Sequence, residues 1–528
     1  MKKTEQTATT MKPTLGLMGI TINAMALIAP GAFLWTTYQI QAAPGSAVNM
    51  WFSVFAATII ALLTAVAYSM LAKIYPQAGT GSAYYFAEAA FLEKEQHQHF
   101  KFARLSKFLV GWSSHLYYWI YPGVMVAFMG SLIVYIGQVF NPQFASSPLD
   151  KIVICAAFAV VVGVIAYRGV TSSTFANLII NIIQIVSLLS FSALAIWYRF
   201  IHPSYSYLHK TALSVVQPHD VNGLIFQATI AILLVVGFES ATAYASEAKN
   251  PGKDIPRAIL LSLLIQAGVF YLLEYFAANF FIGNFYTSGA NHGFAAAAAS
   301  GAPIGDMAKI LGDQLLFGHG QLYALILAGT VVLALVGTAL ACLNTGVRIS
   351  HAMGKDRELP AVFGFIHEKH QSPHVGVVFL TIVSAVIGGY GVLNIDNLTQ
   401  VTLISNIGTF LLYGITGIVC LVALHGTETE NAFGRVLAPG SAVLLNSAML
   451  IGVLYYAITS GGSTQTDTII AGVFSLAWLA AGFVYLWIQK LLYGKPILHP
   501  WDYKKKKYGS QGFVPYVFTY EKETVKQY

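Results

Sequence analysis

Apolar runs of about twenty residues recur along almost the whole chain, and they constrain the fold more than any other feature. A helix of that length crosses about 30 Å of hydrocarbon at 1.5 Å per residue. Only 10% of the 528 residues are charged, whereas soluble domains carry roughly 25%. The chain is therefore predicted to be an all-α integral membrane protein.

About twelve spans follow from these runs and from the Gly, Pro and charged residues that separate them. Their predicted limits are 15–37, 49–72, 109–139, 152–167, 175–197, 224–246, 259–282, 322–353, 375–392, 398–424, 436–458 and 469–493. No small-residue cleavage site follows the first run, so we expect it to remain as a span and not to be removed as a signal peptide.

The distribution of basic residues predicts the orientation of the spans. With the N-terminus inside, 25 of the 29 Lys and Arg residues lie on the side that collects positive charge, and only Lys151, Arg199, Lys210 and Lys309 lie on the other. Both termini are therefore predicted to be cytoplasmic, in a plasma (inner) membrane. The net charge of +7 fits a basic tail that faces anionic lipid, which we favour over nucleic-acid binding.

The first span carries Ala29-Pro30-Gly31 at its centre. Proline removes a backbone hydrogen bond and clashes with the preceding turn, and glycine allows backbone angles that other residues avoid. Freed backbone groups are tolerated in a membrane only where they are buried in protein or face a wet cavity. The sequence predicts a broken helix here, and an ordinary proline kink is the alternative.

The sixth span combines a glycine with a carboxylate, in Gly237-Phe238-Glu239. A charge at that depth costs at least about 2.5 kcal/mol on insertion scales, so Glu239 is expected to face the protein interior or a water path. A purely structural Glu239 that bonds to a neighbouring helix is the alternative. A second broken helix is predicted at this position.

Breaks in spans one and six are typical of an inverted five-plus-five repeat, in which discontinuous helices from the two halves form the central site. The N-terminus of a half-helix offers amide N–H groups to a carboxylate, and freed carbonyls accept hydrogen bonds from an ammonium. A zwitterion satisfies both ends, so an amino acid or a related organic amine is the predicted ligand.

Four segments resemble the amino acid/polyamine/organocation (APC) transporter family, which has the LeuT-type fold. They are 237–259, with GFESA and ASEAKNPGKDIPRAI; 76–84, PQAGTGSAY; 168–170, RGV; and 352–360, AMGKDRELP. The resemblance implies an APC superfamily permease with a five-plus-five core and two further helices. The corresponding regions are a cytoplasmic segment 1–13, a transport core 14–425, two helices in 426–493 and a basic cytoplasmic tail 494–528.

The same resemblance implies where the substrate binds. The implied substrate-binding residues are Ala29, Pro30, Gly31, Tyr118, Pro122, Met129, Val236, Gly237, Phe238 and Glu239. Tyr118, Pro122 and Met129 come from similarity with arginine/agmatine-type exchangers and are expected to share one helix face, with ordinary packing as the alternative. Pro30 lacks an amide donor, which keeps amines among the candidate substrates. Glu239 is also a candidate gate residue, and Glu247 and Arg348 are hypothesised to pair when the inner gate closes.

Several functions are left open or excluded. The fifth span has no lysine for proton coupling, so exchange, facilitated transport and coupling through His115, Glu239 or Glu274 remain alternatives. The three cysteines form no CxxC pair, and no metal cluster, serine elbow or phosphate loop is present. No metal, cofactor or enzymatic activity is therefore predicted. A non-transporting amino-acid sensor with a transporter fold is the alternative to a permease.

Overall fold

The computed structural model describes residues 14–29, 32–43, 45–76, 82–94, 101–168, 174–245, 247–356, 358–367, 372–425 and 436–493. Two predicted site residues, Pro30 and Gly31, lie outside these ranges, as do the whole N-terminal segment and the whole basic tail.

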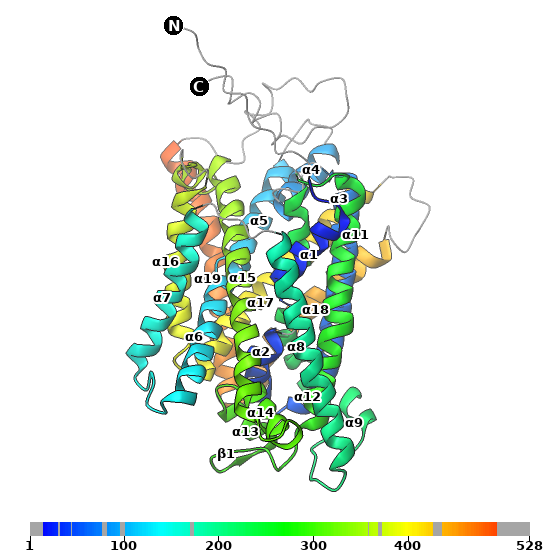
Figure 1. Ribbon diagram of the computed structural model, residues 1–528. Coiled ribbons are helices and arrows are strands. Elements are labelled where there is room, and N and C mark those ends of the chain that lie inside the picture. The colour runs from blue at the N-terminus through cyan, green and yellow to red at the C-terminus, as the bar shows by residue number, and fades with distance from the viewer. Residues whose placement is uncertain are drawn as a thin grey trace.

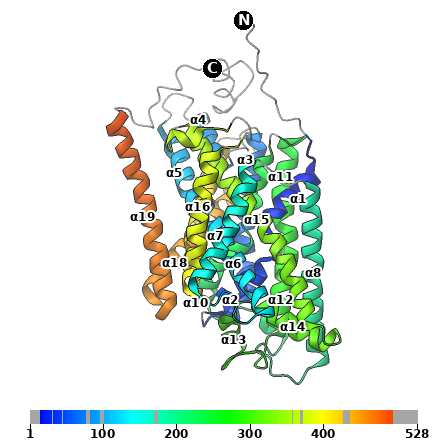
Figure 2. The same ribbon diagram turned by 60° about the vertical axis from the view of Figure 1, so that its left-hand side comes forward.

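Within those ranges, twelve helical segments are long and apolar enough to cross a membrane, which confirms the predicted fold class. They contain α1 (Leu17–Ile28) with α2 (Ala32–Ala42), η1 (Ala47–Asn49) with α3 (Met50–Ile74), α5 (Lys101–Tyr118) with α6 (Tyr121–Phe140), α7 (Pro148–Tyr167), α8 (Thr174–Ile201), α10 (Val221–Ala231) with η3 (Ile232–Leu234) and η4 (Phe238–Tyr244), α11 (Pro251–Leu263) with η5 (Leu264–Tyr271) and α12 (Leu272–Phe281), α15 (Gly320–Lys355), α16 (His374–Gly391), α17 (Ile395–Leu424), α18 (Ala438–Thr459) and α19 (Gly462–Tyr493). The start of α1 and the end of α19 lie at the same end of the bundle (Figure 2).

Short elements close the two ends of the bundle. α4 (Ala83–Lys94) and η6 (Ala361–Gly364) belong to the end where α1 begins, which we call the terminal face. α9 (Ala212–Val216), the strands β1 (Thr287–Ser288) and β2 (Asn291–His292), α13 (Gly293–Ala299) and α14 (Pro303–Leu315) gather at the opposite end (Figure 1). We call that end the far face.

The first and sixth crossings are both broken, as the sequence predicted. α1 ends at Ile28, Ala29 adopts a left-handed conformation with φ of 49°, and α2 begins at Ala32. In the sixth crossing, Gly237 has a φ of 116°, a value that glycine adopts readily, between η3 and η4. Both interruptions lie near the middle of their crossings, where the bilayer offers no water to satisfy the backbone.

The third crossing differs from its prediction. It begins at Lys101 and not near residue 109, and it contains a turn at Trp119–Ile120 between α5 and α6. Lys101, Arg104 and Lys107 recur every three residues, so the first two turns are too polar to be recognised as a span. The turn has a local cause, because Pro122 cannot donate a backbone hydrogen bond to the carbonyl of residue 118.

The last two helices lie at the edge of the bundle. The most apolar window of α19 is only 17% buried, against 73% for the first crossing and 78% for the sixth. Figure 2 shows α19 standing at one side of the molecule. The buried centre of the protein is therefore formed by the two broken crossings and the helices around them.

Candidate functional site

Glu239 lies directly after the break in the sixth crossing, and its carboxylate is fully enclosed by protein. Its Oε2 atom accepts hydrogen bonds from the backbone N–H of Gly237 (3.0 Å) and the hydroxyl of Tyr413 (2.9 Å). The hydroxyl of Tyr118 donates to Oε1 (3.0 Å). Three donors satisfy the oxygens of a carboxyl group on a residue that is 1% exposed, and they tie the break to α5 and α17.

The carbonyls around the break of the first crossing accept hydrogen bonds from side chains of two neighbouring crossings. Tyr271 donates to the carbonyl of Ala29 (2.7 Å) and Gln266 to that of Met25 (2.6 Å). Thr338 of α15 donates to the carbonyl of Ala26 (3.3 Å). Satisfied carbonyls remove the main cost of interrupting a helix in hydrocarbon, so these side chains stabilise the break.

The sixth crossing is supported in a corresponding way. Asn406 of α17 donates from Nδ2 to the carbonyl of Thr229, at 2.7 Å, near the end of α10. Its Oδ1 atom is buried and has no hydrogen-bond partner among the described residues. Both broken helices thus depend on polar side chains from other crossings.

Aromatic rings form a wall beside Glu239. Phe238 and Tyr413 lie with ring centroids 5.4 Å apart, and Tyr68 contacts both of them edge-on, at 6.0 and 6.1 Å. A cavity of only about 10 Å³ borders Tyr118 on the terminal side, between α4 and α5. That volume holds about one water molecule. Glu239 itself is buried.

The structure brings together only part of the predicted substrate-binding set. Val236, Gly237 and Phe238 lie buried at the break beside Glu239, and Tyr118 contacts Glu239 directly. Ala29 lies buried at the break of the first crossing. Pro122 and Met129 are buried in α6, beyond the turn at Trp119–Ile120, and none of the hydrogen bonds to Glu239 involves them.

Glu247 and Arg348, the hypothesised gate pair, form no salt bridge in the described conformation, although both lie close to Tyr244. The backbone around Glu247 makes a different contact. The Glu247 carbonyl accepts hydrogen bonds from the backbone N–H groups of Thr14 and Leu15, both at 2.9 Å. The backbone N–H of Lys249 donates to the carbonyl of Leu15 at 2.8 Å. These bonds join the start of α1 to the chain after η4 and close the terminal face there.

A buried ion cluster at the terminal face was not predicted. Lys107 of α5 lies 2.8 Å from Glu88 of α4 and 2.6 Å from Asp356 after α15, and its side chain is 3% exposed. The ammonium also lies 4.8 Å from the ring centroid of Tyr84. Residues 88–107 read as a polar stretch and Asp356 as part of a loop motif, so nothing in the sequence indicates that they meet.

Glu358 belongs to the same cluster, because the hydroxyl of Tyr84 lies 3.0 Å from both its Oε2 and Oδ2 of Asp356. Burial raises the pKa of the Glu358 carboxyl from its ordinary 4.5 to about 8. Between these two pH values, the Glu358 carboxyl keeps its proton in the folded protein and loses it in the unfolded chain. Stability contributed by this group is therefore lost as the pH rises through that window.

We expect Glu358→Gln to flatten this pH dependence. The variant should melt at the same temperature as the wild type near pH 5 and a few degrees higher near pH 8.5, since glutamine cannot be charged. Melting curves of purified protein in detergent measure the effect, with Glu247→Gln as a control on the same face. A variant that follows the wild-type curve at both pH values contradicts the assignment.

The two other candidate proton carriers are His115 and Glu274, and neither takes part in the hydrogen bonds to the Glu239 carboxyl. The His115 ring stacks on Trp119 with a centroid separation of 4.1 Å and contacts Trp112 and Trp478. Glu274 is completely buried in α12, and neither of its oxygens has a hydrogen-bond partner among the described residues.

Sequence reasoning missed Tyr413 and the capping side chains Gln266, Tyr271, Thr338 and Asn406. The one available signal was the presence of polar groups inside apolar runs, which is typical of functional positions in membranes. That signal does not say which break each side chain serves.

The described part of the chain contains twelve crossings, and the first and sixth are interrupted around buried polar groups. This arrangement is typical of a polytopic membrane transporter. Residues 14–486 match the model of the amino acid permease family. The chain belongs to that family and is an APC superfamily permease, not an enzyme.

Relatives that match most of the chain transport different small molecules, according to their names. The chain is 23% identical to the branched-chain amino acid permease BcaP of Bacillus subtilis, over 92% of this chain and 94% of that protein. It is also 23% identical to the low-affinity putrescine importer PlaP of Escherichia coli, over 90% and 93% of the two chains. A methylthioribose transporter of Bacillus subtilis is 24% identical over 66% of this chain and 67% of its own.

Proposed function

We propose that the protein is a secondary transporter that carries an amino acid across the plasma membrane by alternating access. The proposal rests on the breaks in the first and sixth crossings and on the polar contacts that stabilise each break. The names of the relatives support an amino acid or an amine as substrate. The concentration of Lys and Arg on one side supports cytoplasmic termini.

In the proposed binding mode, the substrate carboxylate lies at the N-terminus of α2, just after Ala32, whose own N–H donates to the carbonyl of Ala29 (3.2 Å). The first amide groups of a helix have no helical acceptor. The substrate ammonium lies against the backbone at Val235 and Val236, which are outside the helical segments of the sixth crossing. In this mode Glu239 makes no direct contact with the substrate. It holds the break in shape through Tyr118, Tyr413 and Gly237.

Reconstitution of the purified protein into liposomes tests this function. The panel contains labelled L-leucine, L-lysine, L-glutamate and putrescine, assayed for uptake with and without the same compound inside. Saturable flux of an amino acid supports the proposal. Saturable binding without flux indicates the sensor alternative, and flux of putrescine alone indicates an amine carrier.

Tyr118→Phe is expected to lower the transport efficiency, Vmax/KM, about tenfold. The variant leaves Oε1 of the buried Glu239 carboxyl without this donor, and an unsatisfied buried polar group costs about 1–3 kcal/mol. Tyr117→Phe is the matched control, since the neighbouring hydroxyl has no hydrogen-bond partner among the described residues. Equal transport by the two variants contradicts the role given to Tyr118.

A further inference from the structure

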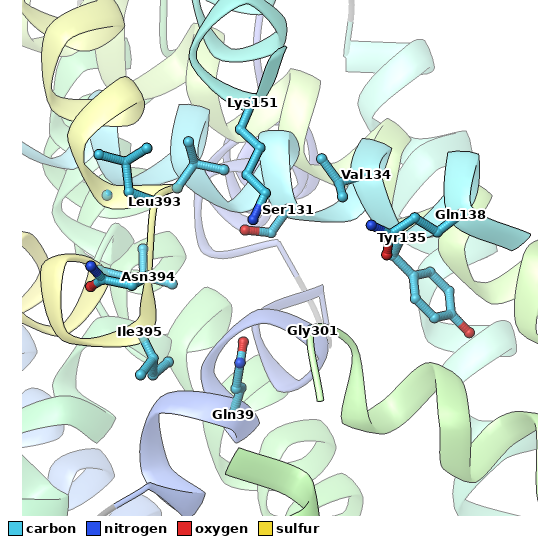
Figure 3. A pocket seen from close by; sticks show the side chains of 13 residues that line it. Gln39, Ser131, Val134, Tyr135, Gln138, Lys151, Gly301, Leu393, Asn394 and Ile395 are labelled. Carbon is cyan, nitrogen blue, oxygen red and sulfur yellow. The ribbon is translucent and has the colours of Figure 1, made fainter. Parts of the chain in front are cut away.

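A polar cavity of about 220 Å³ lies at the far face, away from Glu239. It is bounded by α2, α6, α7 and the segment that joins α16 to α17 (Figure 3). Its volume equals that of roughly seven water molecules, at about 30 Å³ each. The cavity can therefore hold a small solute such as an amino acid.

Lys151 is the single charged residue among those that line the cavity, and it comes from the first turns of α7. In Figure 3 its side chain extends from α7 into the cavity. No carboxylate of the described residues lies within salt-bridge distance of its ammonium. The remaining polar side chains of the lining are uncharged: Gln39, Ser131, Tyr135, Gln138 and Asn394.

Of the acidic residues close to the lining, Asp150 and Asp306 are engaged elsewhere, and Asp396, beside Ile395, forms no salt bridge with Lys151. Asp150 caps the start of α7 through Ser147. Asp306 accepts hydrogen bonds from Ser300 at 2.5 Å and from Tyr286 at 3.1 Å. The ammonium of Lys151 is therefore available to an anionic group that enters the cavity.

The cavity also has a position on the proposed transport path. Gln39 lies seven residues after Ala32 on α2, which is roughly 10 Å along a helix axis. The wall of the cavity at Gln39 is thus about two helical turns from the α2 N-terminus, where the substrate carboxylate is proposed to bind.

We propose that this cavity is an outer docking site, in which the ammonium of Lys151 receives the carboxylate of an incoming amino acid before the substrate reaches the broken helices. The inference rests on the proposed function and narrows its substrate class. A lone cation attracts a zwitterion through its carboxylate and repels a polyamine, which carries only positive charge. The substrate is accordingly an α-amino acid.

Kinetics of Lys151 variants in liposomes test the docking site. Lys151→Gln is expected to raise the KM of the transported amino acid about threefold to fivefold with Vmax unchanged, and Lys151→Glu to raise it further. Lys151→Arg should retain the wild-type KM. Lys210→Gln is the matched control, because Lys210 is exposed at the same face and does not line the cavity. The increase should shrink at high salt.

A second measurement separates the carboxylate from the rest of the substrate. Each amino acid of the panel is compared with its amide as an inhibitor of uptake, beginning with L-leucine and L-leucinamide. The wild-type preference for the amino acid over the amide should fall in Lys151→Gln by the same factor as the rise in KM. An unchanged preference, or a KM equal to that of Lys210→Gln, overturns the docking site.

The two proposals fail in different ways. Absence of amino-acid flux in the wild-type protein refutes the proposed function, and the docking site with it. Normal wild-type flux with no effect of Lys151 variants refutes the docking site alone. Flux of putrescine that falls in Lys151→Gln also overturns it, because a cation that repels polyamines cannot favour their entry.

Discussion

Glu239→Ala is expected to lower amino-acid transport at least a hundredfold. The substitution leaves the hydroxyls of Tyr118 and Tyr413 and the N–H of Gly237 buried without their acceptor. Each unsatisfied buried donor costs about 1–3 kcal/mol, and all three surround the break on which the binding site depends. The shape of the site is therefore lost.

Initial uptake rates in liposomes with equal amounts of incorporated protein measure this effect. Glu239→Gln keeps one acceptor oxygen and replaces the other with an amide NH₂ group, so it should fall between the wild type and Glu239→Ala. Glu274→Gln is the comparison for loss of a buried carboxyl as such, because the Glu274 oxygens have no hydrogen-bond partner among the described residues. Wild-type rates in Glu239→Ala would remove Glu239 from the site.

Lys107→Met is expected to lower the free energy of unfolding by about 3–5 kcal/mol, the usual cost of removing one partner from a buried ion pair. Lys107 and Glu88 are 3% and 2% exposed, so water cannot replace the missing ammonium. The cluster joins α4, α5 and the segment after α15, and its loss should loosen the terminal face.

Melting of the detergent-solubilised protein reports the change. Lys253→Met is the matched control, since Lys253 is exposed at the same face and such surface changes are usually within about 0.5 kcal/mol. Adding Glu88→Gln to Lys107→Met should recover part of the lost stability, because the double variant no longer leaves the Glu88 carboxylate buried without its cation. A melting temperature of Lys107→Met equal to that of Lys253→Met contradicts a stabilising cluster.

Sequence reasoning predicted the parts of the fold that the bilayer imposes. Twelve crossings, the all-α class and the breaks near Pro30 and Gly237 follow from the length of the apolar runs and from local backbone chemistry. Where the local pattern was ambiguous, the prediction was less accurate. The first turns of α5 carry Lys101, Arg104 and Lys107 at helical spacing, and the predicted third span therefore begins only at residue 109.

Local rules could not predict the contacts that build the site. Glu239 meets Tyr413, 174 residues later in the chain, and Tyr84 meets Glu358, 274 residues later. Each of these groups is an ordinary polar residue until the helices pack. The same holds for Lys151, which is one of several basic residues at the far face until the cavity forms around it.

The sequence by itself therefore determined how often the chain crosses the membrane and where two of those crossings must break, because hydrocarbon penalises every unpaired backbone group along each helix. Only the tertiary structure decided which side chains satisfy the broken ends, which charges become buried together and which cation remains available. Those outcomes depend on distances between helices, and these distances are set by packing across the whole bundle.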